Sequence, residues 1–495
     1  MEIISDLCFG VFTVKRESEL ADFVKKRLGD IMSDTAVIIC NYNGGEAILK
    51  CIGAALESQN ILCDIYVIDN ASTDDSVNKI DEIFGDAITV VQNPENLGGS
   101  GGFGRGLRIA AEKGYSYIML LDNDAYVDED TVKKLREYLE ANPDVGIVGA
   151  KIMMADDPER IMDYAKTLNF DTFMDRSKWC GQPDSEEASV PRDCDFAAAT
   201  AAMVRREALI KCGGMDEAHF IYYDDIEMSY RIKLSGYRVV SLGNARAWHD
   251  SGMRKKVSNT FARYYLTRNR HRFFAKYIPE SDIERFTEYM LSRAFSYLYG
   301  THYKGRKDIF DTEKYILEDF IRDRRGKAGE RRVNELQTDG YRRIEEILPG
   351  LQSACLCLLD GATERGVVKF CKKLWERRPN AVIVLDAGAE MRQLAETCQR
   401  QLLATGTCNE KSIRIKESAE KETFGRQIYF CGHVKDIVDN MLPDICIDSH
   451  ENLIAKEQDY LYFRNYDNSY AFFKALYHDS VVATIYKIRE ERIPC

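Results

Sequence analysis

The hydrophobic residues of the first 150 positions fall into short runs, separated by polar loops and by stretches with helical spacing. Each run is rich in strand-forming residues. The runs span residues 35–40, 63–68, 87–92, 115–121 and 145–150. Strands that alternate with helices in this way predict a doubly wound, mostly parallel α/β sheet with right-handed crossovers. The polar or glycine-rich tips of the first four strands then lie at one sheet edge, where such sheets bind ligands.

Two carboxylates follow the fourth run directly. Asp122 and Asp124 are separated only by Asn123. Carboxylates at positions i and i+2 can bind one hard divalent cation, which prefers oxygen ligands and keeps phosphate oxygens in its shell. The alternative is that both acids are solvated and merely end the strand. The tips of the earlier strands add Asn41 and Asp69, the latter followed by Ser72 or Thr73 as a cap of the next helix.

A glycine-rich segment, residues 96–106, follows the third run and precedes a helix that extends to Lys113. Its spacing matches neither the P-loop nor the dinucleotide-binding fingerprint. The glycines are compatible with a flexible turn. They are also compatible with a backbone that approaches a diphosphate closely at the start of a helix, and the neighbouring carboxylates favour this second interpretation.

A second block of candidate chemistry lies between residues 196 and 252. The small-residue run 196–204 suits close approach of a ligand, and the aromatic run 219–223 leads into Asp224 and Asp225 at a predicted helix start. Acids in a first turn are favoured by the helix dipole alone. A general base, however, needs one carboxylate aimed into a cleft. His249 follows the predicted strand 237–242 and is a candidate nitrogen ligand for a metal.

Two further stretches carry alternative interpretations. Residues 155–192 predict an irregular, mobile excursion, in which Trp179 is either a sugar platform or packs under a loop. Residues 251–279 contain eight basic residues and no acidic one, so they suit the phosphates of a lipid-linked acceptor or an anionic membrane surface. The alternative is a solvated basic helix. These basic residues are Arg254, Lys255, Lys256, Arg263, Arg268, Arg270, Arg272 and Lys276.

The remaining residues predict three further units around the sheet of residues 34–279. Residues 1–33 form an N-terminal elaboration with a strand at 8–14 and a helix at 17–32, and residues 280–349 a helical segment. In residues 350–495, predicted strands and helices alternate again, which indicates a smaller Rossmann-like domain of unknown role. Its helices begin at Glu364 and Met391. Its strands are expected at 354–359, 381–385, 427–431, 445–448 and 481–488.

Composition narrows the class of protein. The net charge of −12 argues against nucleic acid as a partner, because phosphate backbones require a basic surface. The 15 cysteines are scattered without paired spacing, which favours reduced thiols over a zinc site or a disulfide framework. The sequence shows neither a signal peptide nor a run long enough to cross a bilayer. We therefore expect a cytoplasmic protein, located at the inner membrane face if the basic stretch meets lipid.

Four ordered motifs together resemble a known family. Residues 36–43, 67–74, 96–102 and 121–124 are similar to those of family 2 glycosyltransferases of GT-A fold. Within the family, the resemblance is to the rhamnosyltransferase and galactofuranosyltransferase branch, and the glycine-rich loop favours the galactofuranosyl side. The acidic box 224–227 favours the same side. Residues 247–249 and 264–269 also fit the branch, and the resemblance covers about residues 34–275.

The resemblance implies a metal-dependent, inverting transfer of galactofuranose or rhamnose in cell-surface polysaccharide synthesis. The donor is a UDP- or dTDP-sugar, and the acceptor a glycan or polyprenyl-linked saccharide. Asp122, Asp124 and His249 would bind Mn²⁺ or Mg²⁺, and Asp225 would be the catalytic base. The donor site would comprise Asn41, Asp69, Asn96, Gly98 and Asp122, with Asp69 at the base or ribose. The acceptor or its phosphate would meet Trp179, Asp224 and Arg268. Whether the chain forms a homo-oligomer stays open.

Two other functions are alternatives to glycosyl transfer. A nucleotidyltransferase can also use a metal on an α/β sheet, but it needs a basic residue near the incoming triphosphate, and the first loop, residues 41–45, has none. A non-catalytic sugar-nucleotide sensor or scaffold would not need the full set of carboxylates. Release of pyrophosphate or formation of a glycoside product separates these functions from glycosyl transfer.

Overall fold

The computed structural model describes most of the chain. The described residues are 33–58, 63–250, 257–329, 331–337, 347, 351–406, 408–409, 411–416, 426–438, 445–449 and 451–491. The strand expected at 8–14, the helix expected at 17–32 and the side chains of Arg254, Lys255 and Lys256 lie outside this part of the chain.

The predicted N-terminal α/β unit is built around a ten-stranded sheet with the main order β10-β12-β6-β11-β4-β1-β2-β3. Its strands β1, β2, β3 and β4 are parallel, whereas β11 runs antiparallel to both of its neighbours, β4 and β6. The sheet is therefore mixed rather than mostly parallel. The strands are β1 Thr35–Asn41, β2 Asp64–Asp69, β3 Thr89–Gln92, β4 Tyr117–Asp122, β5 Ala125–Val127, β6 Val145–Met154, β7 Asp157–Asp163, β10 Pro191–Asp193, β11 Ala201–Arg205 and β12 Arg238–His249.

Helices cover both faces of this sheet. Apolar residues of α3 (Ala47–Glu57), α4 (Ser76–Phe84) and α6 (Thr131–Ala141) pack on one face. Those of α5 (Gly98–Lys113), α7 (Arg206–Cys212) and α8 (Asp224–Leu234) pack on the other. Helix α4 begins only at Ser76, with Asp75 in the cap position, so neither Ser72 nor Thr73 is the cap that the sequence predicted. Both layers leave the carboxyl ends of β1, β2 and β4 at one edge.

The glycine-rich segment differs from the prediction of a loop, because helix α5 already begins at Gly98, two residues after Asn96. The side-chain oxygen of Asn96 accepts a hydrogen bond from the Gly98 amide (2.7 Å). Gly98 has a φ of +73°, and a Cβ atom there would lie 1.9 Å from the Phe220 carbonyl oxygen. Glycine is therefore required at this position for close packing against the segment before α8.

The excursion over residues 155–192 is more regular than its composition suggests. It contains β7, the paired short strands β8 (Thr167–Asn169) and β9 (Met174–Arg176), and a 3-10 turn at Glu186–Ser189. Trp179 is only 6% exposed, and its ring lies 5.8 Å from that of Tyr164. The sugar-platform interpretation of Trp179 is therefore wrong in this structure, since the buried indole has no face left for a ligand.

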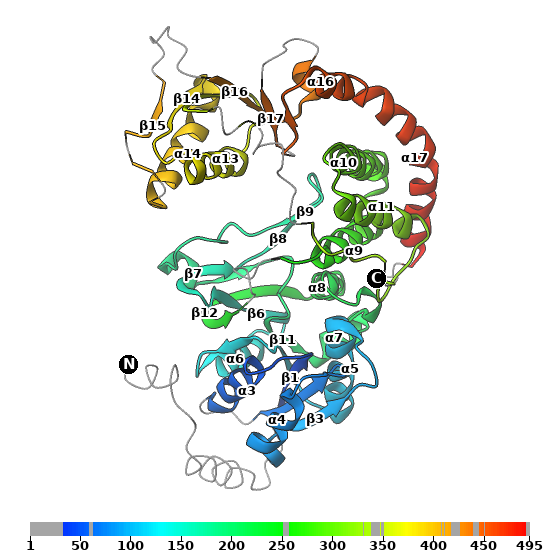
Figure 1. Cartoon of the computed structure of the whole chain (residues 1–495). Helices are drawn as coiled ribbons and strands as arrows, with labels where there is room; N and C mark the ends of the chain where they lie inside the picture. Colours follow the sequence, from blue (N-terminus) through cyan, green and yellow to red (C-terminus); the bar gives the residue numbers. More distant parts are fainter. Residues whose placement is uncertain are drawn as a thin grey trace.

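Four helices pack into a bundle beside the sheet: α9 (Phe261–Tyr277), α10 (Ile283–Tyr303), α11 (Lys307–Ile321) and α17 (Tyr466–Glu490). Helix α17 returns from the end of the chain to lie along α10 (Figure 1). The strand expected at 481–488 is wrong, because this segment belongs to α17. Its apolar residues Val481, Ile485 and Ile488 have helical spacing and are buried in the bundle.

The basic stretch in α9 is mostly directed into the protein. Ion pairs join Arg263 to Glu313, Arg272 to Asp323 and Lys276 to Glu227. These three side chains therefore form neither a solvated basic helix nor a continuous surface for phosphates or lipid. None of the described helices combines the length and apolarity required to cross a membrane.

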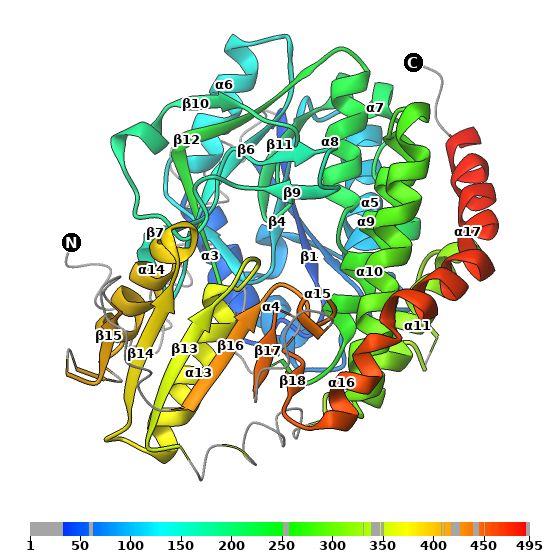
Figure 2. The ribbon, with the colours of Figure 1, turned by 90° about the horizontal axis from the view of Figure 1, so that it is seen from above.

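The C-terminal residues form a second sheet with the order β15-β14-β13-β16-β17-β18, parallel except at β18 (Figure 2). Its core includes side chains from α13 (Glu364–Arg377) and α14 (Arg392–Ala404). A smaller α/β unit was expected here, although strands β15 and β18 had not been predicted. The strands are β13 Ser353–Leu358, β14 Val382–Ala387, β15 Ile413–Ile415, β16 Arg426–Cys431, β17 Cys446–Asp448 and β18 Leu453–Ile454.

Candidate active site

Three candidate metal ligands meet at the edge of the main sheet. Asp122 ends β4, and His249 ends β12. Strand β5 starts directly after Asp124 and pairs antiparallel with β12, which places His249 opposite Ala125. The Nε2 atom of His249 lies 3.0 Å from Oδ1 of Asp124 and 3.9 Å from Oδ2 of Asp122. One possible ligand atom from each residue lies within 4.8 Å of the other two, a spacing that one cation can bridge.

The charges at this cluster favour a bound cation. Burial raises the pKa of Asp122, and the charges of Asp124 and Asp224 raise it further, against the opposing effect of His249. Burial alone would lower the pKa of His249, but its hydrogen bond to Asp124 and the charge of Asp122 outweigh that effect and raise the pKa. Negative charge is thus in excess. Two carboxylates and an imidazole fit Mn²⁺ or Mg²⁺ by ligand type.

Asp225 lies in the first turn of α8 and is held by two backbone amides. Its Oδ2 accepts a hydrogen bond from the Ala199 amide (3.1 Å), and its Oδ1 accepts one from the Ile226 amide (2.8 Å). The next residue after Ala199 is Thr200, whose carbonyl accepts a hydrogen bond from the Asp122 amide (3.2 Å). The short segment before β11 therefore connects Asp225 to the metal-ligand cluster.

The electrostatic surroundings of Asp225 shift its pKa toward neutral pH. Burial and the charge of Asp224 raise the pKa of Asp225 to about 7, although Lys166 acts in the opposite direction. Asp224 is itself buried, and its charge acts on both Asp122 and Asp225. A carboxylate that titrates near neutral pH is suited to accept a proton during a reaction. Lys166, which forms an ion pair with Asp163, is a site residue that sequence analysis missed.

The residues expected to bind a nucleotide form two groups. Asn41 is buried at the end of β1, and its Nδ2 donates to Oδ1 of Asp69 (2.9 Å). Its Oδ1 accepts a hydrogen bond from Asn123 (3.1 Å), so Asn41 joins Asp69 to the segment between the two candidate metal-binding carboxylates. Asn96 and Gly98 instead belong to the start of α5. The Gly98 carbonyl accepts a hydrogen bond from Asn70 (2.8 Å), which connects this second group to the tip of β2.

The segment directly before Asp224 has an unusual backbone. Phe220, Tyr222 and Tyr223 have φ angles of 67°, 64° and 67°, in the left-handed region. Non-glycine residues held there cost roughly 1–3 kcal/mol each and persist only where the surroundings fix them. The segment is therefore strained, and its conformation determines where Asp224 and Asp225 lie.

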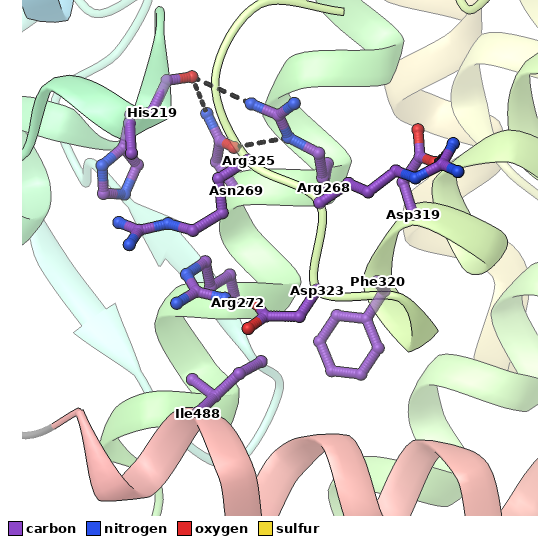
Figure 3. Close-up of a pocket in the computed structure, with 11 residues that line it drawn as sticks. His219, Arg268, Asn269, Arg272, Asp319, Phe320, Asp323, Arg325 and Ile488 are labelled. Carbon is purple, nitrogen blue, oxygen red and sulfur yellow. Dashed lines mark hydrogen bonds and ion pairs between the residues drawn. The ribbon is translucent and has the colours of Figure 1, made fainter.

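Two adjacent residues of α9 hold this segment by its carbonyl groups. Asn269 donates from Nδ2 to the carbonyls of His219 (3.1 Å), Ile221 (2.8 Å) and Tyr222 (2.9 Å). Arg268 donates to the His219 carbonyl (3.0 Å), as Figure 3 shows. Arg268 is only 4% exposed, so the expectation that it meets an acceptor phosphate is wrong in this structure. Asn269 lies in the stretch 264–269 that resembles the family branch, but it was assigned no role; its signal in the sequence is a polar pair within an aromatic helix.

Comparison with known proteins agrees with these sequence motifs. Residues 36–213 match the model of glycosyl transferase family 2. Galactofuranosyltransferase GlfT2 of Mycolicibacterium smegmatis is 25% identical over 206 residues, a match covering 38% of this chain and 31% of that protein. dTDP-rhamnosyl transferase RfbF of Shigella flexneri is 24% identical over 245 residues, covering 48% of this chain and 78% of that protein.

Among solved structures, a crystal structure of GalNAc-T7 with UDP, GalNAc and Mn²⁺ aligns with a TM-score of 0.42 and 15% identity. The alignment covers 54% of this chain and 52% of that one. The family match spans β1, β4, both carboxylates of the metal-ligand cluster and the segment that joins Asp225 to it. Residues 36–213 of this chain, which carry these elements, are therefore similar to glycosyl transferase family 2.

Proposed function

We propose that this chain transfers a sugar from a nucleotide-diphosphate donor to a hydroxyl group of a glycan or lipid-linked acceptor, with inversion at the anomeric carbon. The proposal rests on two separate groups at one sheet edge, one suited to bind a metal and the other suited to accept a proton. Asp122, Asp124 and His249 form one cluster. Asp225, with a pKa raised to about 7, is connected to that cluster but is not part of it. We place this reaction in residues 34–279, with residues 280–349 and 350–495 as separate helical and α/β units.

The metal-ligand cluster would hold Mn²⁺ or Mg²⁺ against the donor diphosphate. A divalent cation at this position neutralises the negative charge that develops on a departing nucleoside diphosphate. The chain's own contribution is to hold the three ligands together through the β5–β12 ladder and the end of β4. Asn41 keeps the Asp69 carboxylate in place at the neighbouring strand tip, where the donor's base or ribose would bind.

Asp225 would act on the acceptor. The acceptor oxygen forms a bond to the anomeric carbon while the bond from that carbon to the diphosphate oxygen breaks. The leaving group departs with the electron pair of the broken bond, and the acceptor's hydroxyl proton passes to the Asp225 carboxylate. Attack from the face opposite the leaving group inverts the anomeric configuration. The two amides that bind Asp225 would fix the direction in which its carboxylate points.

The relatives indicate which donors should be tested first. Their names suggest a galactofuranosyl or rhamnosyl donor, so the first screen would use UDP-galactofuranose and dTDP-rhamnose, with UDP-galactose and GDP-mannose for comparison. A donor that binds only the folded chain should raise its melting temperature, and here only when Mn²⁺ is present. The donor that stabilises the chain should then yield a glycoside product. Pyrophosphate release from a nucleoside triphosphate would instead establish a nucleotidyltransferase.

The strained segment before α8 yields a prediction for Asn269. Asn269→Ala removes the donor that binds three carbonyls, and we expect the turnover number to fall roughly 10–100-fold because Asp225 is displaced by a fraction of an ångström or more. The KM for the donor should stay nearly unchanged, since the metal ligands lie on other elements. Steady-state kinetics of Asn269→Ala and of the unchanged chain would measure this separation.

A matched control for Asn269 is Asn142→Ala at the end of α6, where the side-chain amide also donates to a backbone carbonyl, that of Tyr138 (2.8 Å). This variant should keep its turnover number. Equal losses in the two variants, or a parallel loss of donor affinity in Asn269→Ala, would show that Asn269 stabilises the fold in general rather than positioning Asp225.

A further inference from the structure

A large cavity lies where the sheet domain, the helical bundle and the C-terminal residues meet. Its volume is about 840 Å³, within the range of small-molecule sites in proteins. Side chains from α9 and α10 form one wall, α17 and the residues around α15 (Lys435–Val438) form another, and Met174 of β9 closes a third side. Sites for ligands often form at such junctions between units.

The cavity wall carries more positive than negative charge. Arg263 and Arg293 both line it, and both pair with one buried carboxylate, that of Glu313 (2.6 and 3.1 Å). One carboxylate cannot neutralise two guanidinium groups. Lys435 adds a further cation at the opposite wall, where its partner is the exposed Asp467. This excess is unusual for a chain with a net charge of −12.

Arg270 is the most available of these cations. It lines the cavity and donates from Nη1 to the sulfur of Met174 (2.9 Å), a weak acceptor. Its Nε atom is buried and has no hydrogen-bond partner among the described residues. Within the same described part of the chain, Arg270 forms no ion pair. A guanidinium with unused donors is suited to a carboxylate or phosphate oxygen.

Tyrosine side chains contribute much of the remaining lining. Tyr289, Tyr297 and Tyr470 are half-buried and line the same cavity. Tyr297 is held between Arg263 and Arg293, each 4.7 Å from its ring centroid, so this part of the wall is fixed in place. Among the described residues, Glu288 is the one acid in the lining, and it already accepts hydrogen bonds from Tyr470 and Lys474. Aromatic rings with polar tips next to arginines suit a hydroxyl-rich molecule that bears a negative charge.

The cavity adjoins the segment that carries the proposed base. The charge of Arg270 acts on the phenol of Tyr223, the residue directly before Asp224. The Tyr223 hydroxyl donates to Asp175 (3.1 Å), which lies next to Met174 in β9. A ligand held by Arg270 would therefore be close to the start of α8, where Asp225 lies.

From this arrangement we infer that the cavity binds the anionic part of the acceptor, a saccharide that bears a carboxylate or a phosphate. The inference rests on the proposed function, because it assigns the acceptor of that reaction. Arg270, with Arg293 and Lys435, would bind the anionic group, and the tyrosines would contact the sugar rings. The neutral end of the same saccharide would extend toward Asp225.

Direct binding to the full chain tests this inference without turnover. The probes are a mannose trisaccharide, the same trisaccharide with a terminal 6-phosphate, and a hyaluronan tetrasaccharide, which carries carboxylates. We expect the two anionic probes to bind at least tenfold more tightly than the neutral one, and the preference to weaken as salt is added. The relative affinities of the phosphate and carboxylate probes distinguish the two sources of the anion.

Arg270→Gln should lower the affinity for the anionic probes about tenfold or more, because a hydrogen-bonded charge is lost. Arg270→Lys retains the positive charge but loses the planar guanidinium group. Its affinity for the anionic probes should therefore lie between those of Arg270→Gln and of the unchanged chain. The matched control is Arg160→Gln on β7, a half-exposed arginine outside the cavity, which should bind as the unchanged chain does. Equal binding of neutral and anionic probes, or full affinity in Arg270→Gln, would overturn the inference.

The experiment also separates this inference from the proposed function. Metal-dependent stabilisation by the nucleotide sugar reports on the donor site alone, and Arg270→Gln should leave it unchanged. If no nucleotide sugar binds but the anionic saccharides do, the assignment of glycosyl transfer fails while the cavity remains a saccharide site. If the donor binds and the saccharides do not, only the cavity assignment fails.

Discussion

Asp225→Asn is expected to slow sugar transfer by roughly 10²–10⁴-fold, the range that positioned general bases contribute. The amide that replaces the carboxylate cannot accept the acceptor's hydroxyl proton at neutral pH. Donor binding should persist, because Asp122, Asp124 and His249 form a separate cluster. Product formation measured alongside metal-dependent donor binding would show the two effects independently.

The pH dependence of the unchanged enzyme provides a second test of Asp225. Its pKa is raised to about 7, chiefly by burial and by Asp224. A general base acts in its ionised form, so kcat/KM should rise with pH through about 7 and be lost progressively below that value. Asp225→Asn should abolish this ascending limb. Asp171→Asn, which alters a fully exposed aspartate, should keep both the rate and the limb. Transfer that survives in Asp225→Asn would remove Asp225 from this role.

Asp124→Ala is expected to weaken metal-dependent donor binding by roughly 100-fold or more, since even residues that only support metal ligands cost 10–100-fold when lost. The substitution removes one carboxylate and the hydrogen-bond partner that orients His249 (3.0 Å). Titration of the nucleotide sugar in Mn²⁺ and in a chelator would measure the effect. In the unchanged chain, the chelator should abolish donor binding and Mn²⁺ should restore it.

Asp128→Asn provides the matched control for Asp124. Asp128 lies four residues further along the chain and pairs with Arg246 at 3.3 Å, away from the metal ligands. Its loss removes one negative charge from the same region without removing a ligand, so donor affinity should change little. Unchanged Mn²⁺-dependent affinity in Asp124→Ala would exclude Asp124 from the metal site.

Local sequence patterns determined the elements that carry the site. The apolar runs ending at Asn41, Asp69 and Asp122 are strands in the structure, and their tips lie at one sheet edge because parallel strands share a direction. The start of α8 at Asp224 was likewise readable from an aromatic run followed by acids. These features depend on residues that are close together in the sequence. A short stretch of the chain is therefore enough to predict them.

Contacts between distant segments could not be read in this way. The pairing of β5 with β12 places His249 beside Asp124, and the amide of Ala199 places Asp225 near Asp122. The hydrogen bonds from Asn269 to the carbonyls of the strained segment are contacts of the same kind. Each joins residues that are far apart in sequence, and no spacing along the chain encodes which backbone group a side chain will meet.

The tertiary structure also reversed several local preferences. The β-branched run around Val481 and Ile485 favours a strand, yet burying its apolar side in the helical bundle makes it part of α17. The basic residues of α9 suggested a surface, but Arg272 and Lys276 meet acids that other segments bring to them. The sequence alone thus determined the parallel strands β1 to β4, the positions of their acidic tips and the resemblance to the family. Only packing decided which charges are neutralised, which glycines fit a neighbouring backbone, and which cavity keeps an excess of positive charge, because burial depends on every segment that surrounds a residue.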